Sequence, residues 1–169
     1  MSRMIRIAGI VKESAVDGPG IRFTVFTQGC RHNCPGCHNP QTHDFEGGSD
    51  IGIDSLIEQM KKDPLLDGIT LSGGEPFEQA AACCVLARRV HDMDLNVMTY
   101  SGYTFEKILS GADERPEWLD LLRETDILVD GPFELSRKNI LLRFRGSENQ
   151  RLIDVKRSLA ERCAVPADI

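Results

Sequence analysis

The segment GCRHNCPGCHN, residues 29–39, places three cysteines within eight positions, at Cys30, Cys34 and Cys37. Just before it, the residues IRFTVFT at 21–27 alternate their side chains at a period of two and are rich in β-branched and aromatic types. That pattern predicts a strand leading into the cysteine loop. A chain of 169 residues with 41% hydrophobic content is large enough to be stabilised by its core. Clustered thiols in such a chain indicate metal or redox chemistry rather than disulfides.

The rest of the chain alternates short apolar runs with amphipathic ones. We predict strands at residues 68–72, 96–100 and 127–130, helices at 53–62, 78–93, 105–109, 118–123 and 149–162, and a loop at 45–50. Strands separated by helices form right-handed βαβ units with a parallel sheet. A full eightfold barrel takes about 250 residues. We therefore predict a single α/β domain over residues 1–169, an open partial (β/α) barrel of parallel strands.

Small and polar residues follow each predicted parallel strand. They are Cys30, Gly73, Gly74, Ser101, Gly102, Asp130 and Gly131. Ligands of parallel α/β sheets bind beyond the carboxyl ends of the strands. We therefore expect these strand ends to converge on one site.

Charge and hydropathy limit the partners. The net charge of −6 and the pI near 5.2 argue against a nucleic-acid partner, because binding the phosphate backbone requires clustered cations. No apolar run approaches the roughly 18–20 residues that cross a bilayer, so no membrane association is expected. The N-terminal residues lack an export signal, which predicts a cytoplasmic protein.

The three cysteines admit two interpretations on spacing alone. A structural zinc site needs four ligands, and the fourth would have to be His32, His38, His43 or a distant cysteine. A cubane iron-sulfur cluster held by three cysteines leaves one iron open to a substrate. Cys83 and Cys84 lie in an apolar helical segment and are expected to pack in the core.

The CxxxCxxC pattern, followed one βαβ unit later by the sequence GGEP at residues 73–76, resembles the radical S-adenosylmethionine superfamily. The resemblance implies that Cys30, Cys34 and Cys37 bind a [4Fe-4S] cluster, on whose open iron the methionine group of S-adenosylmethionine is chelated. It implies a cofactor shell formed by Gly36, Cys37, His38, Ser72, Gly73, Gly74 and Glu75. Glycines suit such a strand end because a ligand then reaches backbone carbonyls without meeting a β-carbon. Gly36 stands where many members have an aromatic residue, so the adenine must be held differently, with the 36–38 backbone and the His38 side chain as candidates.

Further motifs resemble the activases of glycyl radical enzymes. DGPGIRF at 17–23 and CHNP at 37–40 resemble the activases in general. SGY at 101–103, ILVDG at 127–131, RGS at 145–147 and NQR at 149–151 resemble one branch, the anaerobic ribonucleoside-triphosphate reductase activating proteins. The likeness runs over residues 7–155.

This resemblance implies a reaction and its partners. An electron donor, flavodoxin or ferredoxin, reduces the cluster, and S-adenosylmethionine is cleaved to a 5′-deoxyadenosyl radical. That radical takes a hydrogen atom from a glycine of a large glycyl radical enzyme, here anaerobic ribonucleotide reductase. The alternatives are activation of another glycyl radical enzyme such as pyruvate formate-lyase, a small-molecule radical enzyme such as a deazaguanine synthase, and a zinc-binding interaction module without catalysis.

Three charged residues have two interpretations each. Asp130 is expected either to hold a ribose hydroxyl, a cation or the incoming glycine loop, or to cap the turn that follows it. Arg145 and Arg151 are expected either to bind a carboxylate or the partner's surface, or to be solvated.

Overall fold

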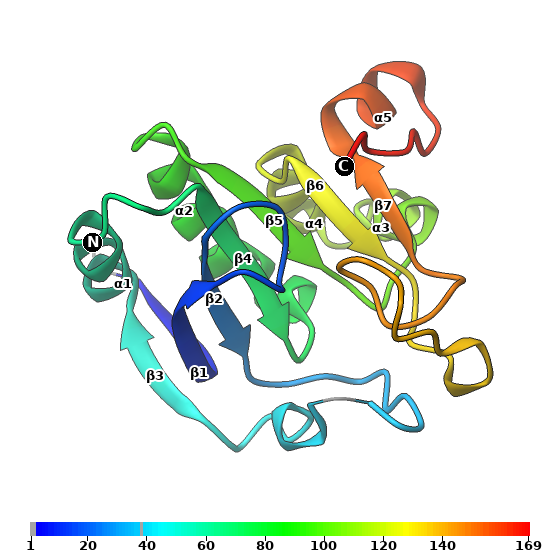
Figure 1. Ribbon diagram of the computed structural model, residues 1–169, viewed down its shortest axis with the longest axis horizontal. Helices are drawn as coiled ribbons and strands as arrows, with labels where there is room; N and C mark the ends of the chain where they lie inside the picture. Colours follow the sequence, from blue (N-terminus) through cyan, green and yellow to red (C-terminus); the bar gives the residue numbers. More distant parts are fainter. Residues whose placement is uncertain (1–2, 38) are drawn as a thin grey trace.

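The computed structural model describes residues 3–37 and 39–169 and shows one seven-stranded sheet with helices packed on one face (Figure 1). The strands are β1 (Met4–Ser14), β2 (Arg22–Thr27), β3 (Ser49–Gly52), β4 (Gly68–Gly73), β5 (Asn96–Tyr100), β6 (Ile127–Asp130) and β7 (Arg151–Asp154). The α-helices are α1 (Ile53–Lys61), α2 (Ala80–His91), α3 (Phe105–Gly111), α4 (Pro116–Arg123) and α5 (Val155–Glu161). Short 3-10 turns are η1 (Pro40–Thr42), η2 (Pro76–Gln79) and η3 (Leu135–Arg137).

The centre of the sheet is parallel. The strand order is β3-β1-β2-β4-β5-β6-β7, and the β2–β4, β4–β5 and β5–β6 pairs run in parallel. These four strands are the predicted ones, and α2, α3 and α4 connect them as predicted. Their carboxyl ends therefore lie along one edge, with the cysteine loop, described over residues 29–37, following β2 (Figure 1).

The outer strands correct the prediction of a sheet built from parallel strands alone. β1 and β3 form antiparallel pairs on one side of the centre, and β7 pairs antiparallel with β6 on the other. β1 was not predicted, β3 begins inside the predicted loop, and the predicted helix at 149–162 is β7 followed by α5. The Asp154 side chain accepts a hydrogen bond from the Arg157 N–H, so it caps α5 and the helix starts only at Val155. Within the described residues β3 and β7 do not pair, and the sheet stays open.

The two faces of the sheet differ in polarity. On the helix face, apolar side chains such as Phe23, Val25 and Leu71 are buried in the core, as are Cys83 and Cys84 of α2, which confirms their predicted place. On the opposite face the Arg22 side chain is fully buried and donates to Thr70 Oγ1, the Ile69 and Pro19 carbonyls and Asn96 Oδ1. Burial lowers the pKa of Arg22 to about 10, despite nearby carboxylates. Through its bond to the Pro19 carbonyl, Arg22 holds the loop of residues 15–21 against the polar face of the sheet.

In the described part of the chain, no helix is both long and apolar enough to cross a membrane.

Candidate functional site

The cysteine loop is anchored where it leaves the sheet. Gly29 donates its N–H to the Thr42 carbonyl at 2.6 Å and has φ +110, and a β-carbon there would lie 2.6 Å from the Phe45 ring. Cys30 donates its N–H to the His43 carbonyl at 3.2 Å. The Cys37 N–H binds the Cys34 carbonyl at 3.1 Å, which closes a turn between the second and third cysteines. Backbone bonds thus hold all three cysteines in one loop.

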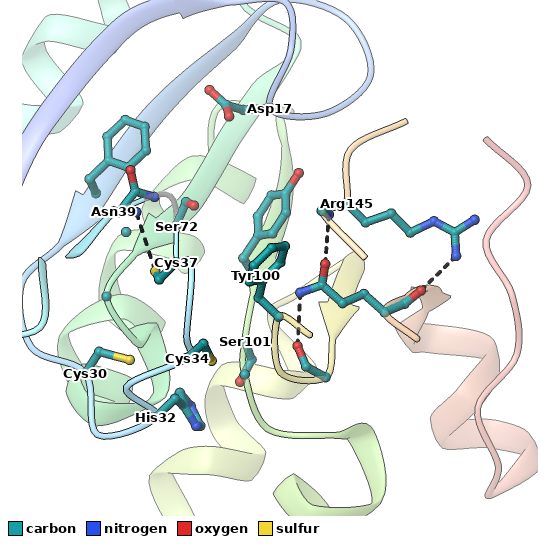
Figure 2. A pocket seen from close by; sticks show the side chains of 18 of the residues that line it. Asp17, Cys30, His32, Cys34, Cys37, Asn39, Ser72, Tyr100, Ser101 and Arg145 are labelled. Carbon is teal, nitrogen blue, oxygen red and sulfur yellow. Dashed lines mark hydrogen bonds between the residues drawn. The ribbon is translucent and has the colours of Figure 1, made fainter. Parts of the chain in front are cut away.

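A cavity of about 550 Å³ lies at the carboxyl edge of the parallel strands. All three cysteines line it, and Figure 2 shows Cys30, Cys34 and His32 on the loop, with Ser101 and Tyr100 opposite them. Its other strand-end residues are Ser72, Gly73, Gly74, Gly102 and Gly131. The structure therefore brings the ends of all four parallel strands to one cavity.

The surroundings of Cys30 and Cys34 favour the neutral form of these two thiols. Burial, with smaller contributions from the nearby Glu75 and Cys34 charges, raises the pKa of the Cys30 thiol to about 11. Burial also raises the pKa of Cys34. Metal ligands are thiolates, so binding of a metal cluster here releases the thiol protons. Within residues 3–37 and 39–169, no three His, Cys, Asp or Glu side chains gather around one point as a single metal ion requires.

The glycine pair at the end of β4 has a structural reason that the sequence did not reveal. Gly73 has φ +93, and a β-carbon there would lie 2.5 Å from the Thr27 backbone nitrogen. A β-carbon on Gly74 would lie 2.5 Å from the Gly29 carbonyl oxygen. The glycines therefore let β4 pack against β2 and the first residue of the cysteine loop, in addition to leaving backbone open to the cavity.

Glu75 lies beneath the cavity and not in its lining. Its side chain is fully buried and accepts hydrogen bonds from the Gly102 N–H at 2.8 Å, Ser101 Oγ at 3.0 Å and the Phe77 N–H at 3.1 Å. Its Oε1 also lies 2.6 Å from His32 Nε2. One carboxylate thus ties the cysteine loop to the loop after β5. His32, one of the candidates for a fourth zinc ligand, has this nitrogen engaged by Glu75.

Asp130 is likewise turned away from the cavity. Arg151 Nε donates to Asp130 Oδ1 at 2.9 Å, and the Phe105 N–H donates to Oδ2 at 2.7 Å. Arg151 also binds Glu106 at 2.7 Å, and the two carboxylates raise the pKa of this guanidinium. Asp130 therefore joins β6, α3 and β7, while its neighbour Gly131 reaches the cavity. Arg151 therefore pairs with two carboxylates of its own chain, while 41% of its side chain remains exposed to solvent.

The remaining predicted residues fall in three places. Gly36 has φ +74, and a β-carbon there would lie 2.9 Å from Leu135 Cδ1, so it packs against residues that follow β6 and does not line the cavity. His38 lies outside the described residues. Arg145 lines the cavity and donates Nη1 to the Gln150 carbonyl at 2.7 Å, while its Nε is buried without a hydrogen-bond partner among the described residues.

Sequence reasoning missed several cavity residues. They are Val16, Phe26, Tyr100, Phe133, Leu142 and Phe144, whereas Asn39 and Gln150 had been noted only as members of motifs. Tyr100 ends β5 and donates its hydroxyl to the Phe144 carbonyl, and burial raises the pKa of this phenol. Gln150 Oε1 accepts from the Gly146 N–H at 2.8 Å, and its Nε2 donates to the Gly131 carbonyl at 3.1 Å. The only signal for Tyr100 was its place at a predicted strand end, and the fold of residues 131–150 had no periodic pattern.

The described residues fit a [4Fe-4S] cluster with a bound cofactor. Iron-sulfur clusters are held by thiolates, and three thiols from one loop open into the cavity. A volume of about 550 Å³ lies within the roughly 300–1,000 Å³ of small-molecule sites. The glycines that line it keep side chains out of the space.

Comparisons with known proteins agree with this donor set. Residues 16–153 match the family model described as a 4Fe-4S single cluster domain. The chain is similar to an anaerobic ribonucleoside-triphosphate reductase-activating protein of Pasteurella multocida, with 34% identity over 80% of this chain and 88% of that protein. Proteins of the same name from Enterobacteria phage T4 and Escherichia coli K12 are 30% and 31% identical, over 81% and 80% of this chain and 86% and 89% of those proteins.

A comparison with solved structures finds a weaker likeness. QueE from Escherichia coli superposes with a TM-score of 0.44 and 14% sequence identity, over 60% of this chain and 53% of that one.

Proposed function

The chain belongs to the family of anaerobic ribonucleoside-triphosphate reductase-activating proteins, and on that premise we propose that it is an activase of the radical S-adenosylmethionine type. It reductively cleaves S-adenosylmethionine at a [4Fe-4S] cluster and generates a glycyl radical on an anaerobic ribonucleoside-triphosphate reductase. The observation that carries this function is the cavity in which three thiols of one loop meet the ends of four parallel strands.

Cys30, Cys34 and Cys37 are the proposed cluster ligands. They are held on one loop by backbone hydrogen bonds, and the three of them leave a fourth cluster position for a substrate. When bound, the cluster supplies the electron that cleaves the sulfonium of S-adenosylmethionine. The other cysteines are not proposed as cluster ligands, because Cys83 and Cys84 are buried in α2 and Cys163 is exposed near the C-terminus.

The strand ends are the proposed binding site for S-adenosylmethionine. Ser72, Gly73 and Gly74 line the cavity next to the thiols and offer backbone groups to the cofactor's amino and carboxylate groups. Glu75 acts as a positioning residue, because its buried carboxylate fixes His32, Ser101 and Gly102 around the cavity without reaching it. Asp130 is likewise a proposed positioning residue, because its hydrogen bonds to Arg151 and Phe105 fix the end of β6 next to Gly131. For the adenine the proposed partners are the backbone of residues 37–38 and the His38 side chain, since Gly36 does not line the cavity.

The architecture supports a substrate that is itself a protein. We infer that residues 1–169 form one domain and that the parallel strands are an open partial barrel of the radical S-adenosylmethionine type. Helices cover one face of the sheet (Figure 1), and a loop of another protein is proposed to enter the cavity at the carboxyl edge of the strands without unfolding this one. The one-electron donor that this reaction requires is proposed to be flavodoxin or ferredoxin. Six free thiols agree with a reducing compartment, the cytoplasm.

Cluster content and cleavage test this function together. The protein is purified without oxygen, reconstituted with iron and sulfide, reduced with dithionite and given S-adenosylmethionine, and 5′-deoxyadenosine is measured. We expect about four irons and four sulfides per chain and cleavage that is lost in Cys34→Ala. Cys163→Ala is the matched control, because that thiol is exposed and outside the cavity. If the protein instead contains one zinc per chain and no sulfide, and does not cleave S-adenosylmethionine, the cysteines form a structural zinc site.

A further inference from the structure

A finger, residues 133–148, projects beside the cavity between β6 and β7 (Figure 1). Its base is closed by an antiparallel bridge between Lys138 and Ser147 and by a hydrogen bond of 2.9 Å from the Glu148 N–H to the Arg137 carbonyl. At the tip, Asn139 Oδ1 accepts from the Leu141 N–H at 2.9 Å and turns the chain. The finger is therefore held in one shape by its own hydrogen bonds.

The tip carries the two most exposed large apolar side chains among the described residues. Ile140 is 85% exposed and Leu141 is 86% exposed. Single exposed apolar residues are ordinary on protein surfaces, but two adjacent ones held at the end of a bonded turn form a preformed apolar contact. Burying such a pair against another protein removes apolar surface from water with little loss of conformational freedom.

The charge of the finger is opposite to that of the whole protein. The finger contains four basic residues and two acidic ones, within a chain of net charge −6. Arg137 and Lys138 are exposed at its base. Arg137 lies 4.0 Å from Glu134, and in the part of the chain that the structure describes Lys138 has no ion-pair partner. The apolar tip is thus flanked by two exposed cations, Lys138 and the loosely paired Arg137, that can meet carboxylates of another protein.

The other side of the finger forms part of the cavity. Leu142 and Phe144 line it, and Tyr100 of β5 donates its hydroxyl to the Phe144 carbonyl. Leu135 of the finger packs on Gly36 of the cysteine loop. A molecule that grips the tip is consequently held at the mouth of the cavity.

We propose that the finger docks the reductase: Ile140 and Leu141 insert into an apolar depression of the reductase that is rimmed by carboxylates, opposite Arg137 and Lys138. This inference rests on the proposed function, because it takes the substrate to be that protein. The docking positions the reductase so that its glycine-bearing segment enters the cavity beside the finger.

The test compares affinity and catalysis in I140S/L141S. The dissociation constant of its complex with the anaerobic reductase of the same organism is measured without oxygen by sedimentation. We expect the constant to rise about 30-fold, as for the loss of one interface hot spot. Cleavage of S-adenosylmethionine without the reductase should equal that of the wild type, and the glycyl radical yield should recover at high activase concentration. Leu65→Ser is the matched control, since Leu65 is 64% exposed in the loop before β4, at the opposite end of the strands.

Two results would overturn the docking role. One is an unchanged dissociation constant in I140S/L141S. The other is an equal fall in cleavage when the reductase is absent, which would mean that the tip acts on the cavity itself. The affinity measurement needs no catalysis, so it decides the docking role by itself. If the wild-type protein fails to cleave S-adenosylmethionine, that result contradicts the proposed function and leaves the comparison of affinities valid.

A charge reversal tests the chemistry of the partner's face. R137E/K138E should slow association with the reductase about tenfold at low salt and weaken its dependence on ionic strength. Unchanged or faster association would show that the face opposite the finger is not acidic.

Discussion

Single residues at the strand ends serve the protein's own packing as much as any ligand. Glu75 is buried and bound to groups of three segments, the cysteine loop, η2 and the loop after β5. A buried carboxylate is tolerated only where hydrogen bonds replace its water. The GGEP sequence was interpreted as a cofactor motif, and the structure adds that its glutamate holds the cavity's walls together.

Removing the Glu75 carboxylate should therefore destabilise the fold. Glu75→Ala leaves the Phe77 and Gly102 N–H groups unpaired, and we expect a loss of about 3 kcal/mol, or roughly 6–12 °C in melting temperature. Thermal unfolding under anaerobic conditions measures it. Glu58→Ala is the control: Glu58 is exposed and, in the described part of the chain, pairs only with Lys61 at 3.6 Å, so its loss should change stability by less than about 0.5 kcal/mol. Equal melting temperatures for both variants would contradict the positioning role.

Gly73 supports a second prediction at the same scale. Gly73→Ala places a methyl group against the β2 backbone at a positive φ, so we expect a loss of roughly 2 kcal/mol or more and a poor yield of folded protein. Gly9→Ala in β1 meets nothing within 4 Å and should leave stability unchanged or raise it by up to about 1 kcal/mol. The two melting curves decide the matter, and a Gly73→Ala protein as stable as Gly9→Ala would refute the packing argument.

At the scale of elements, the sequence predicted the four central strands because each has a recognisable hydrophobic pattern of its own. β2, β4, β5 and β6 read as short apolar or alternating runs, and each was predicted near its observed bounds. β3 and β7 have four residues each and are specified by their pairing with β1 and β6, which no local window contains. The finger escaped prediction for the same reason, because its shape depends on the bridge from Lys138 to Ser147 and on Gln150.

The end of α2 gives a pH-dependent contribution to stability. Burial of His91 disfavours its charged form, but Asp126 Oδ2 at 2.8 Å and Glu124 Oε2 at 3.3 Å outweigh it, and the pKa of His91 is raised above 6.5. Arg88 is the other charged group that faces Glu124. A raised folded-state pKa adds stability that is complete below about pH 6.5 and is lost as the pH rises through the folded-state value.

His91→Gln isolates this contribution. The melting temperature of the wild type should exceed that of the variant most at about pH 6, and the difference should shrink by about pH 9 as the imidazolium deprotonates. Thermal unfolding of both proteins at several pH values measures the difference. The cysteine thiols titrate in both proteins, so their contribution cancels in the difference. A difference that is constant or that grows with pH would contradict the assigned ion pairs.

For the whole molecule, chain order explains how much of the site was visible in the sequence. The cysteines and the glycine pair follow two predicted neighbouring strands, so their convergence could be predicted from topology alone. The directions of the Asp130 and Glu75 side chains could not, because both depend on tertiary partners such as Arg151 and His32. The part of the cavity wall that Phe144 of the finger forms could not be predicted either, because its contact with Tyr100 joins residues 44 positions apart in the sequence.

The glycyl radical itself is the most direct test of the central claim. The reconstituted, reduced protein is mixed with S-adenosylmethionine and the anaerobic reductase, and the reductase is examined by electron paramagnetic resonance. We predict an organic radical signal split into a doublet by one α-hydrogen, which collapses when the reductase is made with α-deuterated glycine and is missing with Cys34→Ala. If S-adenosylmethionine is cleaved but no such signal forms on a reductase that binds the protein, the account of this chain as its activase is wrong.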